Sequence, residues 1–327
     1  MPHRIALLLF ALALALTACA GSTPQPTEAA LTPVELSLGY IPDVQFAPYY
    51  VGIAKGFFAE RGIELSIRHR QETDAAKLLA TDELHFAVIS GEQVLLGRQQ
   101  GLPLVYVFEW YERFPVAIAA KQSSGIQRIE DLRGRSVGVP VREGASYIGL
   151  EALLAAGGLT DADIDLRTTG YAQVETLLTD QVEAVVVYAA NEPVQLEALG
   201  EAVNVIYVAD YADLVSNGLV TNEKTIAEKP DLVRAMVAAL AEALGYTIDH
   251  PDEAFEISKQ FVEGLSDPQV AATARQVLAR SIDLWRADRL GETRLESWEA
   301  MQEVLLNMGL LSEPLDLSKA FTNEFLP

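Results

Sequence analysis

Hydrophobic and polar positions along this chain switch repeatedly between the period of a strand and the period of a helix. Residues 34–40 alternate between apolar and polar side chains, as a half-buried strand does. Residues 48–60 then follow a helical pattern that opens with a proline, and residues 63–67 alternate again. Such switching predicts strands joined by helices, and therefore a largely parallel sheet with helices on its faces.

The same pattern continues to residue 108. It predicts a helix over 73–79 capped by Thr73, an apolar strand over 84–89 and a strand over 104–108. Between them, Ser90-Gly-Glu-Gln93 matches a capping box and predicts the start of a helix that ends near Gln99.

A second α/β region follows, and a helical tail comes after it. Four more strands are expected at residues 136–139, 164–168, 182–188 and 203–208. Helices are expected between them at residues 147–156, 172–178 and 192–199. Beyond Thr221 the pattern is purely helical, with a capping box at Thr225-Ile-Ala-Glu228 and helices at 230–249, 251–262, 267–284 and 293–308.

A purely helical tail cannot build an α/β domain by itself, so we expect it to return and cover the first sheet. The chain then crosses twice between two lobes, and we place the crossings at residues 114–118 and 216–220. Lobe 1 would comprise 34–116 and 219–327, and lobe 2 would comprise 117–218. Two lobes joined by two strands form a hinge around a cleft, where ligands prefer to bind.

The N-terminus predicts export and a lipid anchor. His3 and Arg4 precede the apolar run Ile5–Leu16, which is shorter than the roughly 20 residues that span a bilayer. Cys19, the chain's single cysteine, follows, and the segment resembles a bacterial lipoprotein signal. Residues 1–18 would be removed, and Cys19 would carry lipid on the extracytoplasmic face of the cell membrane. Residues 19–33 would form a flexible tether. The alternative is an ordinary secretory signal with a chance cysteine.

Composition excludes several classes of function. The formal net charge is −22 at pH 7, whereas nucleic-acid binding needs lysine and arginine against the phosphates. No nucleophile elbow and no phosphate-binding loop ending in Gly-Lys-Ser/Thr occurs, so the chain is not an ATPase. His69, His85 and His250 are scattered without metal-ligand spacing. We therefore expect no metal, no cofactor and no catalytic residue.

Several motifs, in their order and spacing, resemble one known family. They are Gly39-Tyr-Ile-Pro-Asp-Val-Gln-Phe-Ala-Pro-Tyr-Tyr-Val-Gly-Ile-Ala-Lys-Gly-Phe-Phe58 with Arg61-Gly-Ile63, Asp131-Leu-Arg-Gly-Arg-Ser-Val-Gly-Val-Pro140, Leu153-Leu-Ala-Ala-Gly-Gly158 and Tyr188-Ala-Ala-Asn-Glu-Pro193. From residue 34 to the C-terminus, the chain resembles periplasmic substrate-binding proteins of ABC importers, in the subgroup that binds thiamine-pyrimidine precursors and riboflavin.

The resemblance implies a type II periplasmic binding fold and a monomer that delivers its ligand to a membrane permease with its own ATPase. A receptor-coupled sensor with the same fold is an alternative. The fold also occurs in a thiamine-pyrimidine synthase, which calls for catalytic cysteines and histidines. The mature chain keeps only the lipidated Cys19, so we expect no enzyme.

Candidate ligand-binding residues follow from a rule for open α/β sheets, in which ligands lie beyond the carboxyl ends of the strands. The rule selects residues 43–49, 71–73, 90–92, 110–114, 144–147 and 188–192. From these segments we predict the set Asp43, Gln45, Phe46, Tyr49, Ser90, Glu92, Trp110, Tyr111, Tyr147, Tyr188, Asn191 and Glu192.

The aromatic members of this set favour a flat heterocycle, because each aromatic pair adds about 0.5–1.5 kcal/mol beyond burial. Trp110 and Tyr111 are our stacking candidates, whereas Phe46 suits plain packing. The carboxylates and amides could fix polar edges of a ligand, or could be loop residues and helix caps. Among the ligands of the resembled subgroup, riboflavin fits best, because its ring system rewards several aromatic side chains and its ribityl hydroxyls reward scattered acceptors.

Two other ligands stay open. A formylated aminopyrimidine is smaller and needs fewer rings. A sulfonate could use the backbone N–H groups of Gly144-Ala-Ser146, with Arg113 and Arg142 nearby in sequence. The expected cleft also carries acidic residues that would oppose an anion, namely Asp43, Glu92, Glu112, Glu143 and Glu192.

Overall fold

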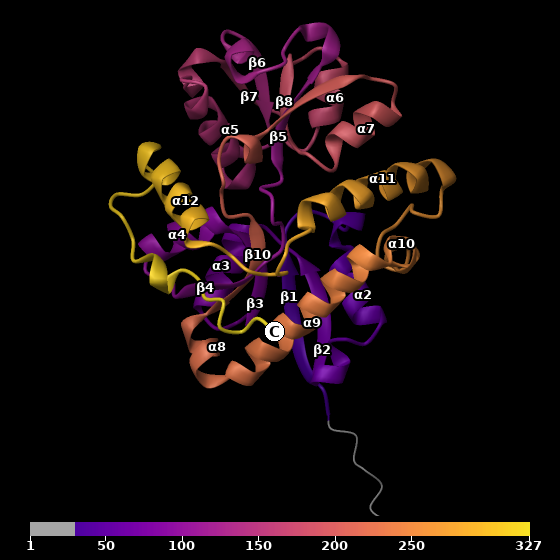
Figure 1. Ribbon diagram of the computed structural model, residues 1–327, viewed down its shortest axis with the longest axis vertical. Helices are drawn as coiled ribbons and strands as arrows, with labels where there is room; N and C mark the ends of the chain where they lie inside the picture. Colours follow the sequence, from indigo (N-terminus) through magenta and orange to yellow (C-terminus); the bar gives the residue numbers. More distant parts are fainter. Residues whose placement is uncertain (1–29) are drawn as a thin grey trace, which may run out of the picture. The chain divides into compact units, whose positions relative to one another are not determined.

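The computed structural model describes residues 30–327. The predicted signal peptide and Cys19 therefore lie outside the described residues. Residues Thr32–Pro327 form one compact unit, in which two α/β lobes are each built around a five-stranded sheet (Figure 1). Within residues 30–327, no helix combines the length and apolar character needed to cross a membrane.

Lobe 1 is built on a sheet with the strand order β2-β1-β3-β10-β4. Its strands are β1 (Thr32–Leu38), β2 (Ile63–His69), β3 (Phe86–Ser90), β4 (Leu104–Glu109) and β10 (Asn217–Asn222). Strand β1 pairs in parallel with β2 and β3, whereas β10 runs antiparallel between β3 and β4. Thr32 already pairs with Ile63, so this strand begins inside the segment predicted as a tether.

Lobe 2 is built on a sheet with the strand order β7-β6-β8-β5-β9. Its strands are β5 (Val116–Lys121), β6 (Ser136–Val139), β7 (Asp165–Thr168), β8 (Ala184–Tyr188) and β9 (Val203–Tyr207). Strand β5 runs antiparallel between β8 and β9. In each sheet, the first strand after a crossing, β5 or β10, therefore runs antiparallel to both of its neighbours.

The chain crosses between the sheets at residues 110–115 and again at 208–216, slightly earlier than predicted. The predicted crossings, 114–118 and 216–220, were placed too late. Val116 already pairs within the sheet of lobe 2, and Asn217 already pairs within the sheet of lobe 1. The two crossing segments contact each other. The Ser216 hydroxyl donates to the Tyr111 carbonyl at 2.5 Å, and Arg113 pairs with Asp210 at 2.6 Å.

Helices cover both sheets, at or near the predicted positions. Lobe 1 carries α2 (Ala47–Ala54), α3 (Glu72–Ala80) and α4 (Gly91–Gln99). Lobe 2 carries α5 (Gly144–Ala156), α6 (Gln173–Leu178) and α7 (Glu192–Ala198). The tail forms α8 (Glu223–Glu228), α9 (Pro230–Asp249), α10 (Pro251–Ser258), α11 (Pro268–Trp285) and α12 (Leu295–Asn307).

Four local predictions were wrong, and each has a physical cause. Thr73 does not cap a helix, because α3 already begins at Glu72 and its N-cap is Gln71. Helix α2 ends at Ala54 rather than at residue 60, because Gly56 adopts a left-handed φ of 82° that a continuing helix cannot accept. Ser90 makes no capping bond, since its hydroxyl bonds to glutamate side chains instead. Helix α8 is capped by Asn222, whose side chain accepts from the Thr225 N–H at 2.6 Å, rather than by Thr225.

The helical tail returns to lobe 1, as expected from its pattern. Helix α9 buries Val233, Met236, Val237, Leu240 and Leu244, which share one face at helical spacing, and this face lies against α2. Helix α12 packs on α4 (Figure 1). Helix α11 also contacts α7 of lobe 2. The tail thus completes the core of lobe 1 and touches both sides of the cleft.

Gly218 in β10 offers a direct test of this packing. A Cβ at this position would lie 2.1 Å from the Tyr106 ring and 2.3 Å from the Phe108 carbonyl oxygen. We expect Gly218→Ala to lower the free energy of unfolding by about 1–3 kcal/mol, because the inner strand β10 must shift away from its neighbour β4. The control is Gly245→Ala on α9, where the nearest atom is a Leu290 methyl carbon at 3.5 Å and alanine favours the helix. Urea unfolding should separate the two variants, and equal stabilities would contradict the packing of β10.

Candidate functional site

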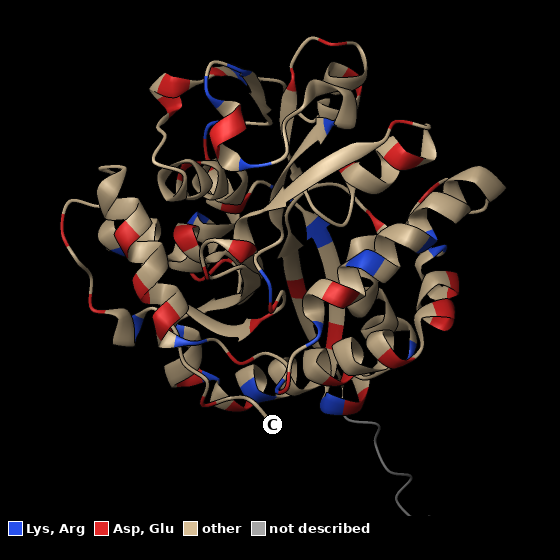
Figure 2. Ribbon diagram, turned by 45° about the horizontal axis from the view of Figure 1, so that its top comes forward, with Lys and Arg blue, Asp and Glu red and all other residues tan. Residues whose placement is uncertain are grey.

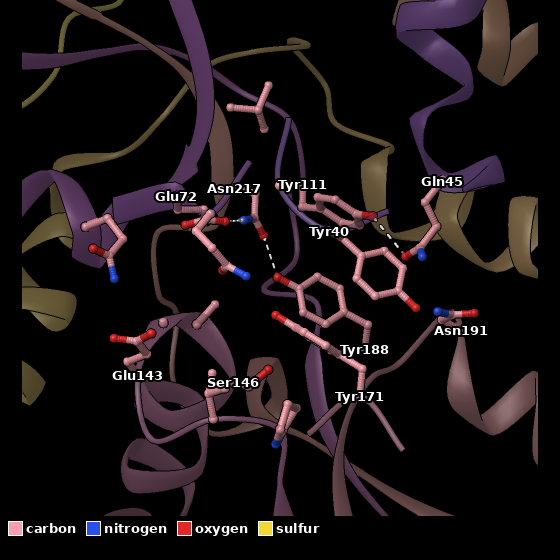
Figure 3. Close-up of a pocket in the computed structure, with 18 of the residues that line it drawn as sticks. Tyr40, Gln45, Glu72, Tyr111, Glu143, Ser146, Tyr171, Tyr188, Asn191 and Asn217 are labelled. Atoms are coloured by element: carbon pink, nitrogen blue, oxygen red, sulfur yellow. Dashed lines mark hydrogen bonds between the residues drawn. The ribbon is translucent and has the colours of Figure 1, made fainter. Parts of the chain in front are cut away.

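A cleft lies between the two lobes, at the carboxyl ends of their parallel strands (Figure 3). Lobe 1 lines it with residues that follow β1, β2 and β4, and lobe 2 with residues that follow β6, β7 and β8. Its empty space, counted together with the open solvent at its mouth, is about 1110 Å³. The position agrees with the rule that selected the candidate segments.

Seven residues of the predicted set line this cleft. They are Gln45, Phe46, Trp110, Tyr111, Tyr188, Asn191 and Glu192. The others do not line it: Asp43, Tyr49, Ser90, Glu92 and Tyr147. The seven lining residues come from both lobes and stay candidates for ligand contact. That they bind a ligand remains a prediction.

The five residues outside the lining have other contacts. Asp43 accepts from the backbone N–H and the side-chain amide of Gln45 at 2.9 and 3.1 Å, so it caps the short turn at Val44–Phe46. Tyr49 has no exposed surface and packs edge-on against Trp110 at 5.3 Å. Ser90 and Glu92 are also fully buried. Tyr147 lies on α5 outside the lining.

Two tyrosines that the predicted set missed face each other across the mouth of the cleft. Tyr40 follows β1 in lobe 1 and Tyr171 follows β7 in lobe 2, and their ring centroids lie 5.6 Å apart at 63°. The side chains are 39% and 59% exposed. Both residues follow the carboxyl end of a strand, so the rule that selected the other segments could have found them.

The aromatic rings divide into a buried wall and an open pair. Trp110 is 3% exposed and Tyr111 is 2% exposed. The Trp110 ring lies within 6 Å of Phe46, Tyr111 and Trp285, as measured between centroids. Other protein side chains therefore cover most of the Trp110 ring. Tyr40 and Tyr171 offer more open ring surface than Trp110 and Tyr111, so they join the stacking candidates, and the choice of Trp110 and Tyr111 stays a prediction.

A chain of hydrogen bonds crosses the cleft from one lobe to the other (Figure 3). The Tyr188 hydroxyl in lobe 2 donates to Asn217 Oδ1 at 3.0 Å, and Asn217 Nδ2 donates to Glu72 Oε1 at 3.1 Å. The Ser90 hydroxyl and N–H donate to Glu72 Oε2 at 2.6 and 3.0 Å. Asn217 begins an antiparallel strand, so the strand-end rule could not reveal it.

The lining is acidic. It holds three glutamates, Glu72, Glu143 and Glu192, and one basic side chain, Arg70, which is paired with Glu35 at 2.5 Å. Burial raises the pKa of Glu192 to about 7 and raises the pKa of Glu72 as well. In the described part of the chain, no cluster of three metal-ligating side chains is present.

Comparisons with known proteins place this architecture in a family. The model of the family described as NMT1/THI5 like matches residues 43–254. The riboflavin-binding protein RibY of Chloroflexus aurantiacus is 40% identical, over 100% of this chain and 99% of its own length. The chain belongs to the NMT1/THI5-like family.

Other relatives in the comparison are more distant. The formylaminopyrimidine-binding protein of Halalkalibacterium halodurans is 26% identical and covers 94% of each chain. A 4-amino-5-hydroxymethyl-2-methylpyrimidine phosphate synthase of Legionella pneumophila is 23% identical, over 90% of this chain and 92% of its own length. This NMT1/THI5-like chain therefore has both binding proteins and synthases among its relatives, as the sequence motifs indicated.

Solved structures confirm the predicted fold class. The periplasmic aliphatic sulphonate binding protein SsuA of Escherichia coli superposes with a TM-score of 0.72, at 14% identity, over 88% of this chain and 91% of that chain. The alkanesulfonate-binding protein SsuA of Xanthomonas axonopodis pv. citri gives 0.71 at 13% identity, over 90% of this chain and 99% of that chain. This NMT1/THI5-like chain thus has the two-lobed periplasmic binding-protein fold.

Buried carboxyl groups make stability depend on pH. Burial raises the pKa of Glu92 and of Glu109 to about 8. Since both values lie above those of the unfolded chain, the folded state holds extra protons, and this stability is lost as pH rises through about 8. We expect the free energy of unfolding to fall between pH 5.5 and 8.5, and Glu92→Gln to reduce that slope by up to about 1.4 kcal/mol per pH unit.

Urea unfolding at pH 5.5, 7.0 and 8.5 measures this slope, with Glu197→Gln at an exposed position of α7 as the control. Hydrogen bonds from Thr160 and Ser136 lower the pKa values of Asp163 and Glu183, respectively. The chosen range avoids the lower pH at which these two carboxylates would lose their stabilising charge. An unchanged slope in Glu92→Gln would show that Glu92 takes up no proton on folding.

Proposed function

We propose that this chain is an extracytoplasmic solute-binding lipoprotein that captures riboflavin and delivers it to the permease of an ABC importer. The cleft carries the proposal, because it brings six aromatic side chains from both lobes around one space: Tyr40, Phe46, Trp110, Tyr111, Tyr171 and Tyr188. A flat fused ring system fits between such groups. The full-length similarity to a riboflavin-binding protein supports the same ligand.

The polar lining suits the rest of riboflavin. Its ribityl chain carries hydroxyl groups, which can donate to the carboxylates and amide oxygens of the lining. Glu143 and Ser146 lie at the start of α5, and Gln173 at the start of α6. They lie on the lobe 2 side of the cleft, and lobe 1 adds the polar side chains of Gln45, Glu72 and Asn217. The cleft thus places polar groups of both lobes beside its aromatic rings.

A thiamine pyrimidine precursor is the second candidate ligand. It is favoured by the relative named formylaminopyrimidine-binding protein, which aligns over 94% of this chain. The single ring of an aminopyrimidine would fill less of the cleft than the three fused rings of riboflavin. The lower identity of that relative, 26% against 40%, favours riboflavin.

A sulfonate is the third candidate, and the charge of the lining opposes it. Gly144 and Ser146 do line the cleft at the start of α5. However, Arg70 already pairs with Glu35, and the lining carries three glutamates. An anion would therefore meet more negative than positive charge. The structural likeness to sulfonate-binding proteins concerns the fold alone.

A binding role is better supported than an enzymatic one. The cleft lining includes neither cysteine nor histidine among the described residues. His85 contacts Asp82 and Lys229 at the far end of β3, away from the cleft. Import and receptor-coupled sensing share the same cleft, and a permease gene next to this one would favour import.

The charge distribution agrees with a small-molecule ligand rather than a nucleic acid. Acidic and basic positions are interspersed along the ribbon of both lobes (Figure 2). With a net charge of −22, the surface would repel phosphate backbones. We propose that the protein is monomeric, with a permease, its ATPase and the membrane as its other partners.

The open tyrosine pair gives a test of the ligand. We expect riboflavin fluorescence to be quenched on binding, and the double variant Tyr40→Ala/Tyr171→Ala to weaken the affinity at least tenfold, about 1.4 kcal/mol. Protein from Ala20 to Pro327 keeps the whole compact unit and suits the titration. Tyr211→Ala is the control, because Tyr211 is 50% exposed and lies outside the cleft. Unchanged affinity in the double variant would remove both rings from the site.

The same titration separates the candidate ligands. Riboflavin, the formylated aminopyrimidine and a short sulfonate are added separately while thermal unfolding is followed, because a bound ligand raises the unfolding temperature according to its concentration and dissociation constant. A shift with riboflavin alone supports the proposed function. A shift with the pyrimidine alone would overturn it in favour of thiamine salvage.

The lipid anchor is tested through Cys19, which lies outside the described residues. Cells that express the full chain are labelled with radioactive palmitate. We expect the wild-type protein to carry the label and Cys19→Ser to lose it completely, since a serine offers no thiol for the lipid. Riboflavin binding by the variant should stay unchanged, because the compact unit begins only at Thr32. A labelled Cys19→Ser protein would contradict the anchor.

A further inference from the structure

A hydrogen-bonded group connects Glu72 in the cleft lining to the buried residues Ser90 and Glu92, and its two carboxyl groups cannot both be ionised. The Ser90 hydroxyl lies within hydrogen-bond distance of Glu72 Oε2, at 2.6 Å, and of Glu92 Oε1. A hydroxyl has one proton to donate. The second short contact therefore needs a proton from a carboxyl group.

Glu92 is the group that holds this proton. It has no exposed surface, and its other oxygen, Oε2, has no hydrogen-bond partner among the described residues. An ionised carboxylate in that position would be buried without compensation. Burial and the nearby charge of Glu72 raise the pKa of Glu92 to about 8, in agreement with this assignment. Neutral Glu92 thus donates to Ser90, and Ser90 donates to Glu72.

Glu72 is the ionised partner and the one that reaches the cleft. Three donors already point at its carboxylate: the Ser90 hydroxyl, the Ser90 N–H and Asn217 Nδ2. A carboxylate offers about four acceptor positions, so about one is left. Glu72 is partly exposed and lines the cleft.

The neighbours of Glu72 leave its charge unpaired. Arg70, which precedes it, is paired with Glu35. The groups on other elements are Glu92 on α4, Asn217 on β10 and Tyr188 on β8, and none is a cation. Within residues 30–327, no lysine or arginine forms an ion pair with Glu72. A donor on the ligand is the partner that this carboxylate lacks.

We propose that Glu72 is the specificity-determining residue of the cleft and accepts a hydrogen bond from an N–H group of the bound heterocycle. This inference rests on the proposed function, which supplies riboflavin as that heterocycle, and the imide N–H of its ring system is the donor. Tyr188 holds Asn217, and Asn217 and Ser90 hold Glu72, so the acceptor is fixed before the ligand arrives. A ligand without the N–H leaves the remaining acceptor position of Glu72 without a donor, which lowers its affinity.

The experiment compares riboflavin with its N3-methyl derivative, which lacks the imide N–H, by fluorescence titration of protein from Ala20 to Pro327. Wild-type protein should bind riboflavin at least tenfold more tightly than the derivative. Glu72→Gln should weaken riboflavin binding at least tenfold and reduce the preference to threefold or less. Glu143→Gln, which changes another glutamate of the lining, should keep the wild-type preference.

The outcomes are distinguishable. If the wild type prefers riboflavin and Glu72→Gln retains the same preference, the methyl group is excluded by shape alone and the role of Glu72 is overturned. If Glu143→Gln reduces the preference as strongly as Glu72→Gln, the acceptor role is not specific to Glu72 and is likewise overturned.

Thermal unfolding of both variants shows whether they are folded. If Glu72→Gln does not fold, Glu72→Asp, which keeps the charge but withdraws it from the cleft, must show the same loss of preference. Failure of the folded wild type to bind riboflavin would overturn the proposed function, and this inference with it.

Discussion

The two crossing segments, held against each other, are the constraint on which the rest of the structure depends. Residues 110–115 leave lobe 1 and residues 208–216 return to it, and each leads into a strand inserted antiparallel within the next sheet. Ser216 is fully buried and bonds to the Tyr111 carbonyl. Arg294, which precedes α12, pairs with Glu112 at 2.5 Å and with Asp213 at 3.1 Å. The helical tail therefore forms ion pairs with both crossing segments, and the cleft lies directly beside them.

This arrangement explains how the cleft comes to combine buried aromatic rings with a polar chain of hydrogen bonds. The first crossing begins with Trp110 and Tyr111, and α11 packs Trp285 behind them. Their rings are buried, so they form a rigid wall rather than adaptable contacts. The return crossing ends at Asn217, which joins Tyr188 of lobe 2 to Glu72 of lobe 1. Any movement of one lobe against the other must change this hydrogen-bonded chain or the contact between Tyr40 and Tyr171.

The acidity of the chain acts differently at the surface and in the cleft. Most surface acids are solvated or paired with lysine and arginine, and exposed pairs of this kind contribute little to stability. The buried glutamates are fewer, but burial raises their pKa values and makes some of them proton donors at neutral pH. A cleft with neutral and charged carboxyl groups side by side can select ligands by the hydrogens that they present.

Local pattern determined most of the elements, because hydrophobic periodicity and cap residues act over a few positions. Strand β6 and the strong amphipathic helix α9 lie where the sequence predicts them. The strand-end rule placed Tyr188 and Glu192 in the cleft, since it depends only on the order of elements.

Only the tertiary structure decided which neighbours each residue meets. Ser90 has a capping sequence but faces two glutamates, Trp110 follows a strand but is enclosed by other rings, and Asn217 reaches the cleft because its strand is reversed. Such contacts join distant positions, as Asn217 and Glu72 do across 145 residues of the chain, so no local pattern records them.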